Sequence, residues 1–341
     1  PPAGQRCTLG IDPGIRTGCK LAVINRLGQF VHTETVYPLE PKRDVEGTFA
    51  ALERLFTQFP IEAVAIGNGT GGRESEVLIK QWLRETSKQG VVCIAVSEAG
   101  ASVYSASEVA REEFPDQDVT VRGAISIARR FQDPLAELVK VDPKSIGVGQ
   151  YQHDVNQTAL KKGLDDVVES CVNRVGVDLN TASYKLLSYV AGVGEALAKN
   201  IVQHRFEHGA FKRREQLLEV SRFGEKAFLQ AAGFLRIREG ENPLDASAVH
   251  PESYPVVQRI SQATGLAVPQ LIGNDAILGG LDPKQFTDGT FGVETVKDII
   301  AELQKPGRDP RESFVAVQFR DDVNKPEDLQ EGMELQGIVT N

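Results

Sequence analysis

The first forty residues alternate between apolar and polar positions, as strands with one buried face do. The segments CTLGID, CKLAVINR and GQFVHTETVYP follow one another within residues 7–38, and Gly28 separates the second from the third. Alternating runs joined by short turns are typical of neighbouring antiparallel strands. We therefore expect the chain to begin with a three-stranded antiparallel meander.

Helical and strand patterns take turns over the next sixty residues. Apolar positions recur at helical spacing over residues 44–59 and 74–87, and two apolar runs, IEAVAIG (61–67) and VVCIAV (91–96), follow them. Strands that alternate with helices lie parallel in a sheet that the helices cover. These patterns predict a mixed α/β sheet with helices on it.

The remainder of the chain has a helical pattern interrupted by polar, proline-containing loops. The clearest loop is ENPLDASAVHPE at residues 241–252. A chain of 341 residues exceeds one ordinary core, so several domains are expected. The predicted segments are an α/β domain (1–140), a connector and helix (141–177), paired helical units (178–240), a small mostly helical domain (241–320) and the beginning of another domain (321–341).

Two stretches of the helical region repeat each other. The positions that recur in step are Leu187, Val190, Gly194 and Glu195, matched by Leu217, Val220, Gly224 and Glu225. Each copy predicts a helix, a tight turn and a second helix that opens on glutamate. Glycine lets backbone N–H groups approach a ligand, and a helix N-terminus favours an anion. The second copy departs from the first, since Arg222 stands in place of Gly192.

This repeat resembles the tandem helix-hairpin-helix domains that grip DNA or RNA through backbone phosphates. The chain as a whole is acidic, with 38 Lys and Arg against 47 Asp and Glu, but residues 178–238 carry ten basic and six acidic side chains. Because cations drive affinity for a polyanion, this basic segment supports the assignment. The candidate nucleic-acid contacts are Gly192, Gly194, Lys199, Arg205, Arg222, Gly224 and Lys226. Alternatively, the hairpins are plain turns between core helices, and the charges form a solvated face.

The motif GIDPGIRTG at residues 10–18 ends the first predicted strand with Asp12. Together with the order of elements, it resembles the RNase H fold, and in particular the YqgF branch related to the RuvC resolvases. That resemblance implies carboxylates around two Mg²⁺ ions, which hydrolyse a phosphodiester. The candidate catalytic residues are Asp12, Glu98 and Asp133.

The match to an active nuclease is incomplete. Asn68 stands where RuvC enzymes carry a glutamate, and Ala136 replaces a second acid in the closing helix. Asp12 also suits a strand-ending turn, and Asp133 before a proline suits a helix terminator. We therefore expect a nuclease-like fold without catalysis, with no cofactor unless an active acidic site binds Mg²⁺ or Mn²⁺.

The end of the chain, KPEDLQEGMELQGIVTN, resembles the opening of an OB-type RNA-binding domain of the ribosomal S-one kind. The order of modules resembles the Tex family of bacterial transcription accessory proteins. It implies a cytoplasmic factor that binds RNA or DNA and works with the transcription machinery, and a chain that is a piece of a longer protein. Four scattered cysteines and the absence of a long apolar run agree with reduced thiols and no membrane.

Three other functions compete with this hypothesis. A metal-dependent nuclease would act through Asp12, Glu98 and Asp133. An actin-like ATPase would use DPGIRTG as a phosphate loop, but that fold needs a second matching half, and the second half of this chain is helical. Protein–protein scaffolding is compatible with nucleic-acid binding and stays open.

Overall fold

The computed structural model describes residues 2–88, 90–307, 309–311 and 330–334. The chain forms two compact units, Pro1–Ala101 with Phe114–Asp133 and Ser102–Glu113 with Pro134–Glu312, each considered by itself below. Most of the expected OB-type segment lies outside the described residues. In the described part, no helix is long and apolar enough to cross a membrane.

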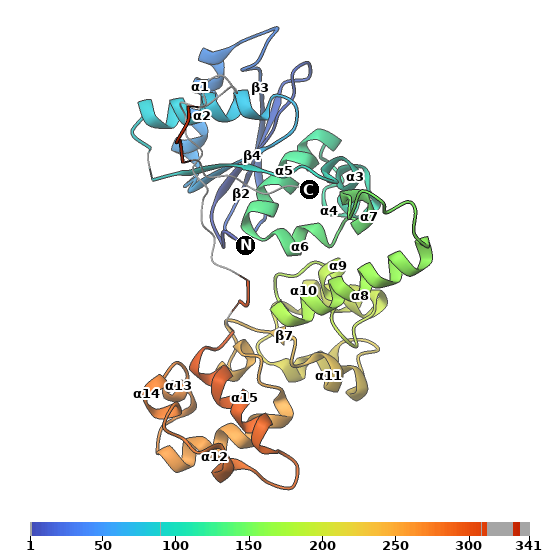
Figure 1. The fold of residues 1–341 in the computed structure, drawn as a ribbon, viewed down its shortest axis with the longest axis vertical. Coiled ribbons are helices and arrows are strands. Elements are labelled where there is room, and N and C mark those ends of the chain that lie inside the picture. The colour runs from blue at the N-terminus through green and yellow to red at the C-terminus, as the bar shows by residue number, and fades with distance from the viewer. Residues whose placement is uncertain (1, 89, 308, 312–329, 335–341) are drawn as a thin grey trace. The chain divides into compact units, whose positions relative to one another are not determined.

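The first unit contains a five-stranded mixed sheet with the strand order β3-β2-β1-β4-β5 (Figure 1). Its strands are β1 (Thr8–Asp12), β2 (Cys19–Ile24), β3 (Phe30–Val36), β4 (Ala63–Gly67) and β5 (Val92–Val96). β2 is antiparallel to both β1 and β3, whereas β4 is parallel to β1 and β5. The predicted meander followed by parallel strands is confirmed, and so is the RNase H-like fold class.

Helices cover both faces of this sheet. Leu9 and Ile11 pack on one face with α1 (Val45–Gln58) and α2 (Gly72–Glu85). Because side chains alternate along a strand, Gly10 turns toward α5 (Val119–Gln132) on the other face. A Cβ on Gly10 would lie 2.2 Å from the carbonyl oxygen of Ala124, so only glycine lets α5 approach β1 this closely.

The second unit begins with short helices. These are most of α3 (Ala101–Ala106), α4 (Glu108–Glu113), α6 (Pro134–Leu138) and α7 (Pro143–Ile146), and all but α7 fall within the expected 1–140 domain. Tyr104, Val109, Ala110 and Val141 form a small core among them. The longer α8 (Gln157–Val175) follows, and Val172 is its one buried residue. The part of the first unit that contains the sheet therefore ends at Asp133, with α4 and most of α3 inserted into its sequence from the second unit.

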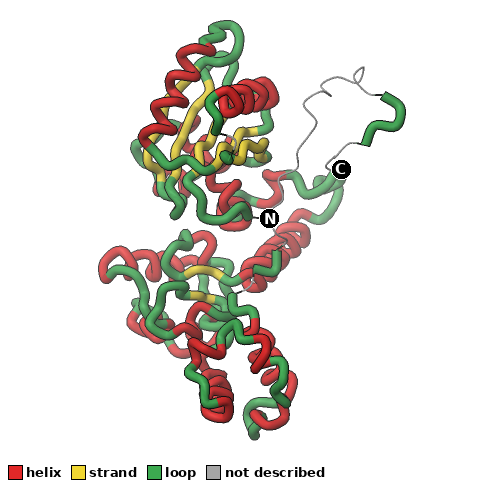
Figure 2. The backbone as a smooth tube through the Cα atoms, turned by 90° about the vertical axis from the view of Figure 1, so that its left-hand side faces the viewer, coloured by secondary structure: helices red, strands yellow, loops and turns green. Residues whose placement is uncertain are grey.

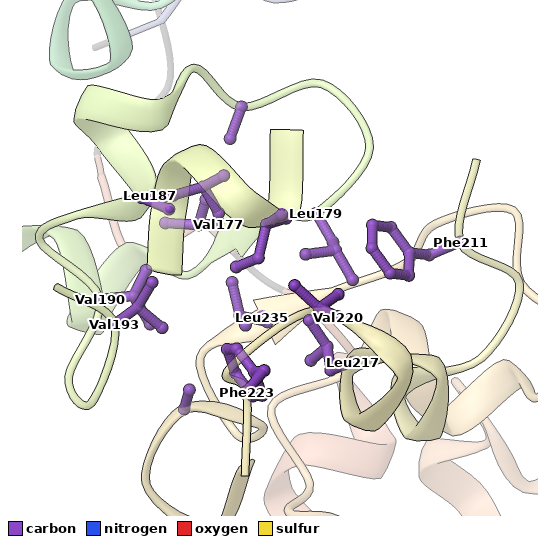
Figure 3. Close-up of a cluster of buried hydrophobic side chains, with 14 of the residues drawn as sticks. Val177, Leu179, Leu187, Val190, Val193, Phe211, Leu217, Val220, Phe223 and Leu235 are labelled. Atoms are coloured by element: carbon purple, nitrogen blue, oxygen red, sulfur yellow. The ribbon is translucent and has the colours of Figure 1, made fainter. Parts of the chain in front are cut away.

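The paired helical units follow α8. Their elements are β6 (Val177–Asp178), α9 (Tyr184–Leu187), α10 (Glu195–His208), η1 (Arg214–Glu219), α11 (Glu225–Ala231) and β7 (Leu235–Arg236). β6 and β7 pair in parallel and so join the two ends of the repeat (Figure 2). Figure 3 shows apolar side chains of both hairpins, among them Val193 and Phe223, in one shared cluster. The two repeats therefore form a single folded body rather than two independent hairpins.

The C-terminal part has its own helical core. Its elements are η2 (Pro243–Ala246), η3 (Pro251–Ser253), α12 (Tyr254–Thr264), α13 (Val268–Leu271), α14 (Asp275–Leu278), η4 (Pro283–Phe286) and α15 (Val293–Gln304). Val256, Ile260, Leu271, Val296 and Leu303 are fully buried in it. The apolar face of α15 therefore packs into this core.

Arg214 connects the paired helical units to this core. It is fully buried, and its guanidinium donates to the carbonyl oxygens of Leu235, Ser247 and Val249 and to the hydroxyl of Tyr254. Its backbone N–H donates to the carboxylate of Asp245 at 3.0 Å. The guanidinium group thus forms three hydrogen bonds to backbone carbonyls and one to a tyrosine hydroxyl, so Arg214 is a structural residue.

Candidate nucleic-acid interface

The two hairpins have the same backbone turn. The N–H of Val193 donates to the carbonyl of Val190 at 2.8 Å, and the N–H of Phe223 donates to that of Val220 at 3.0 Å. At the third position of each turn, Gly192 has a φ of 81° and Arg222 a φ of 64°. These angles place Arg222 in the left-handed conformation that glycine adopts without strain. The repeat inferred from the sequence is therefore also a repeat of backbone geometry.

Both hairpins lead into helices whose first N–H groups have no side-chain cap. Gly194 precedes α10 with φ −75° and ψ 171°, and Gly224 precedes α11 with φ −90° and ψ 173°. A Cβ added to either glycine would meet no atom within 4 Å. The opening N–H groups of a helix lack intrahelical partners and carry the positive end of the helix dipole. Each helix start thus leaves its first N–H groups without a side-chain cap, and the anion binding that the glycine pattern predicted there stays a prediction.

Gly192 has a different role from Gly194. A Cβ on Gly192 would lie 2.7 Å from the Cβ of Gln230 in α11. The first hairpin therefore packs closely on the helix of the second, which explains why this turn needs glycine for contact as well as for its positive φ. Gly192 thus serves the packing of the two hairpins against each other.

Two lysines neutralise the acid at the first helix start. The carboxylate of Glu195 lies 3.2 Å from Lys199 Nζ and 3.3 Å from Lys185 Nζ. Hydrogen bonds from Lys199 and Lys185 lower the pKa of Glu195. Both ammonium groups also lie over the ring of Tyr184, at 5.0 and 5.3 Å from its centre. Lys185 was absent from the predicted site, although its place one helix before Glu195 in a basic segment was a usable signal.

The other basic residues predicted for the interface are of two kinds: exposed side chains, and a side chain whose donors already bind backbone carbonyls. Arg222 and Lys226 are exposed and form no ion pair with any described residue. Arg205 instead donates to the carbonyl of Leu179 at 2.9 Å and to that of Ala182 at 3.1 Å. Burial lowers its pKa. Arg205 therefore holds the loop before α9, and it lies in the last turn of α10 rather than at its start.

In the first unit, Asp12 and Glu98 come together at one end of the sheet. Glu98 fits into a glycine cradle, because a Cβ on Gly67 or Gly69 would lie 2.0 or 2.2 Å from its carboxylate oxygens. Asn68 accepts a hydrogen bond from the Glu98 backbone at 3.1 Å. The GNGTGG loop, which lacks the glutamate of RuvC enzymes, thus positions Glu98 instead.

Asp133 does not join this pair. It caps the C-terminal end of α5, while Gly123 near the opposite end faces Asp12, with a Cβ position 2.6 Å from its carboxylate. Ten helical residues separate the two positions, about 15 Å at the rise of an α-helix. Gln132 confirms the direction of the helix, since it donates to the carbonyl of Arg6 just before β1 begins. Asp133 is the helix terminator that its place before proline also suggested.

The donors at this end of the sheet are too few for a pair of metal ions. The described residues contain no group of three or more His, Cys, Asp or Glu that could hold a metal. Lys20 lies directly across from Asp12 on β2, so its side chain shares a face with that carboxylate. Two carboxylates beside an ammonium group do not fit the three or four that two Mg²⁺ ions require. The position of Lys20 beside Asp12 follows from the pairing of β1 with β2 and was not predicted from the sequence.

The pKa of Asp12 gives a test of this local environment. Burial, followed by the charge of Glu98, raises the pKa of Asp12 to about 6, and Lys20 opposes the increase. A raised carboxyl pKa contributes stability that is present below the unfolded pKa near 4 and is lost as the pH rises toward 6. We expect Asp12→Asn to remove this pH-dependent loss. The difference in free energy of unfolding between the variant and the unchanged protein should therefore be about 2 kcal/mol more in favour of the variant at pH 7 than at pH 3.5.

Urea denaturation of both proteins from pH 3.5 to 7 measures the difference. Glu98→Gln is the matched control, because it removes the neighbouring charge but keeps the carboxyl group of Asp12. Its stability should still fall with pH, over a lower pH range. Parallel pH profiles for Asp12→Asn and the unchanged protein would contradict the assignment.

Three family models match the chain in succession. A Tex protein YqgF-like domain covers residues 6–132, a helix-hairpin-helix motif covers 172–236, and an HHH domain covers 242–311. The first range contains the mixed sheet with Asp12 and Glu98, and the second contains both hairpins.

Curated relatives match over the full chain. Protein tex of Bordetella pertussis is 60% identical over 340 residues, and the transcriptional accessory protein Tex of Neisseria gonorrhoeae is 54% identical. The human S1 RNA-binding domain-containing protein 1 is 37% identical over 409 residues. These matches cover all of this chain but 43%, 44% and 40% of the relatives. The chain therefore spans less than half the length of the proteins it resembles.

Proposed function

This chain belongs to the Tex family, and we propose that it is a transcription accessory factor that holds RNA or DNA by backbone phosphates with little dependence on sequence. The relatives' names supply the link to transcription and to RNA. The paired hairpins supply the physical means, because phosphate is the group common to all nucleic acids.

The observation that carries the proposal is the pair of open helix starts at Gly194 and Gly224. They share one backbone conformation, neither has a side-chain cap, and neither has a neighbour where a ligand would approach. Phosphate oxygens bind well to such N–H groups. Arg222 and Lys226 add charge at the second hairpin, and Lys199 adds it at the first.

In this proposal the RNase H-like unit is a scaffold rather than a nuclease. Asp12 and Glu98 remain from a site whose other acidic positions are Asn68 and Ala136 in this chain. We assign no chemical step to the pair, since its donor set does not fit two metal ions.

A binding titration tests the proposal. Single- and double-stranded DNA and RNA of two unrelated sequences are titrated by fluorescence anisotropy at 50 and 200 mM salt. With about three phosphates neutralised, affinity should fall about thirtyfold between these salt concentrations and change little with sequence. Mn²⁺ in parallel samples should produce no cleavage. Affinity that depends on sequence but hardly on salt would refute the proposal.

Glu195→Gln sharpens the same titration. Removing the carboxylate releases Lys185 and Lys199 from their ion pairs, so affinity should increase about threefold at 50 mM salt. Glu207→Gln is the matched control, because Glu207 lies on the same helix near its far end, where it accepts a hydrogen bond from Gln203. An equal gain from both variants would show a general charge effect and not a local one.

A further inference from the structure

A pocket of about 410 Å³ lies in the second unit, beside the paired hairpins but apart from the helix starts. Arg174 at the end of α8 and Arg236 of β7 line it, together with Asn173, Gln230, Phe234 and His250. None of the described residues that line the pocket is acidic. Two guanidinium groups therefore line it, and we call it the arginine pocket.

Arg236 is held in the pocket with unused hydrogen-bonding capacity. Its Nε is buried and has no hydrogen-bond partner in the described chain. The guanidinium lies against the backbone of Gly176, where a Cβ would come within 2.5 Å of Nε. Burial lowers the pKa of Arg236, which the charge of Glu302 opposes. Burying a cation with an unpartnered donor is unfavourable, and an anion bound beside the guanidinium group would offset part of that cost by its charge.

The polar side chains beside Arg236 are already fixed in place. Asn173 donates to the carbonyl of Tyr189 at 3.1 Å and accepts from the N–H of Ala191 at 3.0 Å. The imidazole of His250 lies 3.0 Å from the carbonyl of Leu229 and accepts from the N–H of Glu252. Asn173 thereby ties the pocket wall to the first hairpin turn. An anion would bind to a preformed wall, and little ordering would be needed.

Arg174 supplies the second cation at the open side. Its side chain is exposed and makes no ion pair with a described residue. A guanidinium group presents several N–H donors in a plane, which suits the oxygens of a phosphate. An exposed arginine at the rim and a half-buried arginine in the wall can contact one phosphate group from two sides.

We propose that the arginine pocket binds a phosphate group, supplied either by a phosphorylated end or by an internal phosphodiester of the nucleic acid held at the neighbouring hairpins. Binding of free phosphate to the pocket is independent of the function proposed above, and only the choice between these two sources rests on it. The pocket would thus bind one more phosphate of the strand that the hairpins bind.

Two measurements on the whole chain test this site. Calorimetric titration with inorganic phosphate measures the pocket alone, and anisotropy with 5′-phosphorylated and 5′-hydroxyl oligonucleotides identifies the source. Each arginine contributes charged hydrogen bonds, so Arg174→Gln and Arg236→Gln should each weaken phosphate binding about tenfold. Arg238→Gln is the control, because Arg238 is exposed, pairs with Asp178 and carries the same charge outside the pocket lining.

The outcomes separate clearly. A preference for the 5′-phosphorylated strand that Arg236→Gln removes indicates a terminal phosphate. An equal loss for both strands, greater than that of Arg238→Gln, indicates an internal phosphodiester. Inorganic phosphate affinity that is undetectable, or unchanged in Arg174→Gln, overturns the proposal even if Arg236→Gln does not fold. If nucleic acid fails to bind at all, the proposed function fails, and inorganic phosphate still decides the pocket.

Discussion

Replacing Gly194 and Gly224 together by aspartate should weaken nucleic-acid binding by at least about thirtyfold, while the melting temperature stays the same or rises. Both glycines have extended backbone angles that any residue adopts, and an added side chain meets open space. Aspartate is a preferred N-cap and would satisfy the free N–H groups itself. It would also place a negative charge where a phosphate should bind, so the fold is kept and the site is lost.

The chain offers a matched control for this variant. Gly292 precedes α15 with φ −80° and ψ 173°, has no side-chain cap and has no atom near its missing Cβ. This helix start lies outside the paired hairpins, so Gly292→Asp adds the same charge at a similar backbone position without changing the proposed site. Gly292→Asp should leave affinity nearly unchanged. Loss of affinity equal to that of the double variant would show that any added charge is sufficient, and the hairpin assignment would fail.

Arg214→Leu should lower the free energy of unfolding of the second unit by about 3–5 kcal/mol. The substitution removes the donors that satisfy three buried carbonyl groups and the hydroxyl of Tyr254, and leucine can satisfy none of them. An unpaired buried acceptor keeps its desolvation penalty, which explains the size of the loss. Urea denaturation followed by circular dichroism measures it.

The neighbouring Arg213 provides the control. Its side chain is 56% exposed and lies 3.5 Å from Glu241, a surface ion pair. Arg213→Leu should change the free energy of unfolding by no more than about 0.5 kcal/mol. If the two variants unfolded at the same urea concentration, Arg214 would not be the structural link described above.

The sheet and the hairpins could be predicted because each depends on local pattern. Period-two alternation gave the strands up to β3, and Gly28 with φ 74° forms the turn that separates β2 from β3. The in-step repeat placed Arg222 opposite Gly192, and the positive φ of both residues confirms that alignment. Where neighbouring residues determine the backbone conformation, the sequence alone was sufficient to predict it.

The arrangement of the acidic residues could not be predicted from local sequence pattern. The resemblance to the RNase H fold implied a helix that closes the sheet, but not which of its ends meets Asp12. The direction of α5 across β1 brings Gly123 to that carboxylate and leaves Asp133 at the far end. Lys20 likewise depends on the pairing of β1 with β2. These positions are set by long-range packing, which no spacing within one element contains.

Basic side chains were the least predictable group. Arg213 and Arg214 are adjacent in a basic segment, yet one is at the surface and the other is completely buried. Arg205 was counted as a phosphate contact, but two backbone carbonyls occupy its guanidinium. A charge count cannot distinguish a cation that faces solvent from one that neutral acceptors satisfy, because both contribute equally to the net charge.

Arg222 adopts a left-handed backbone conformation at the turn of the second hairpin. A side chain in this conformation costs about 1–2 kcal/mol, which glycine avoids, although the freer unfolded chain of glycine offsets part of the gain. The first hairpin keeps glycine in this position and the second does not. A strained residue at an exposed turn is typical of a functional site, which agrees with the phosphate contact proposed for Arg222. The turn of the first hairpin therefore serves packing against Gln230, whereas that of the second presents a charge to solvent.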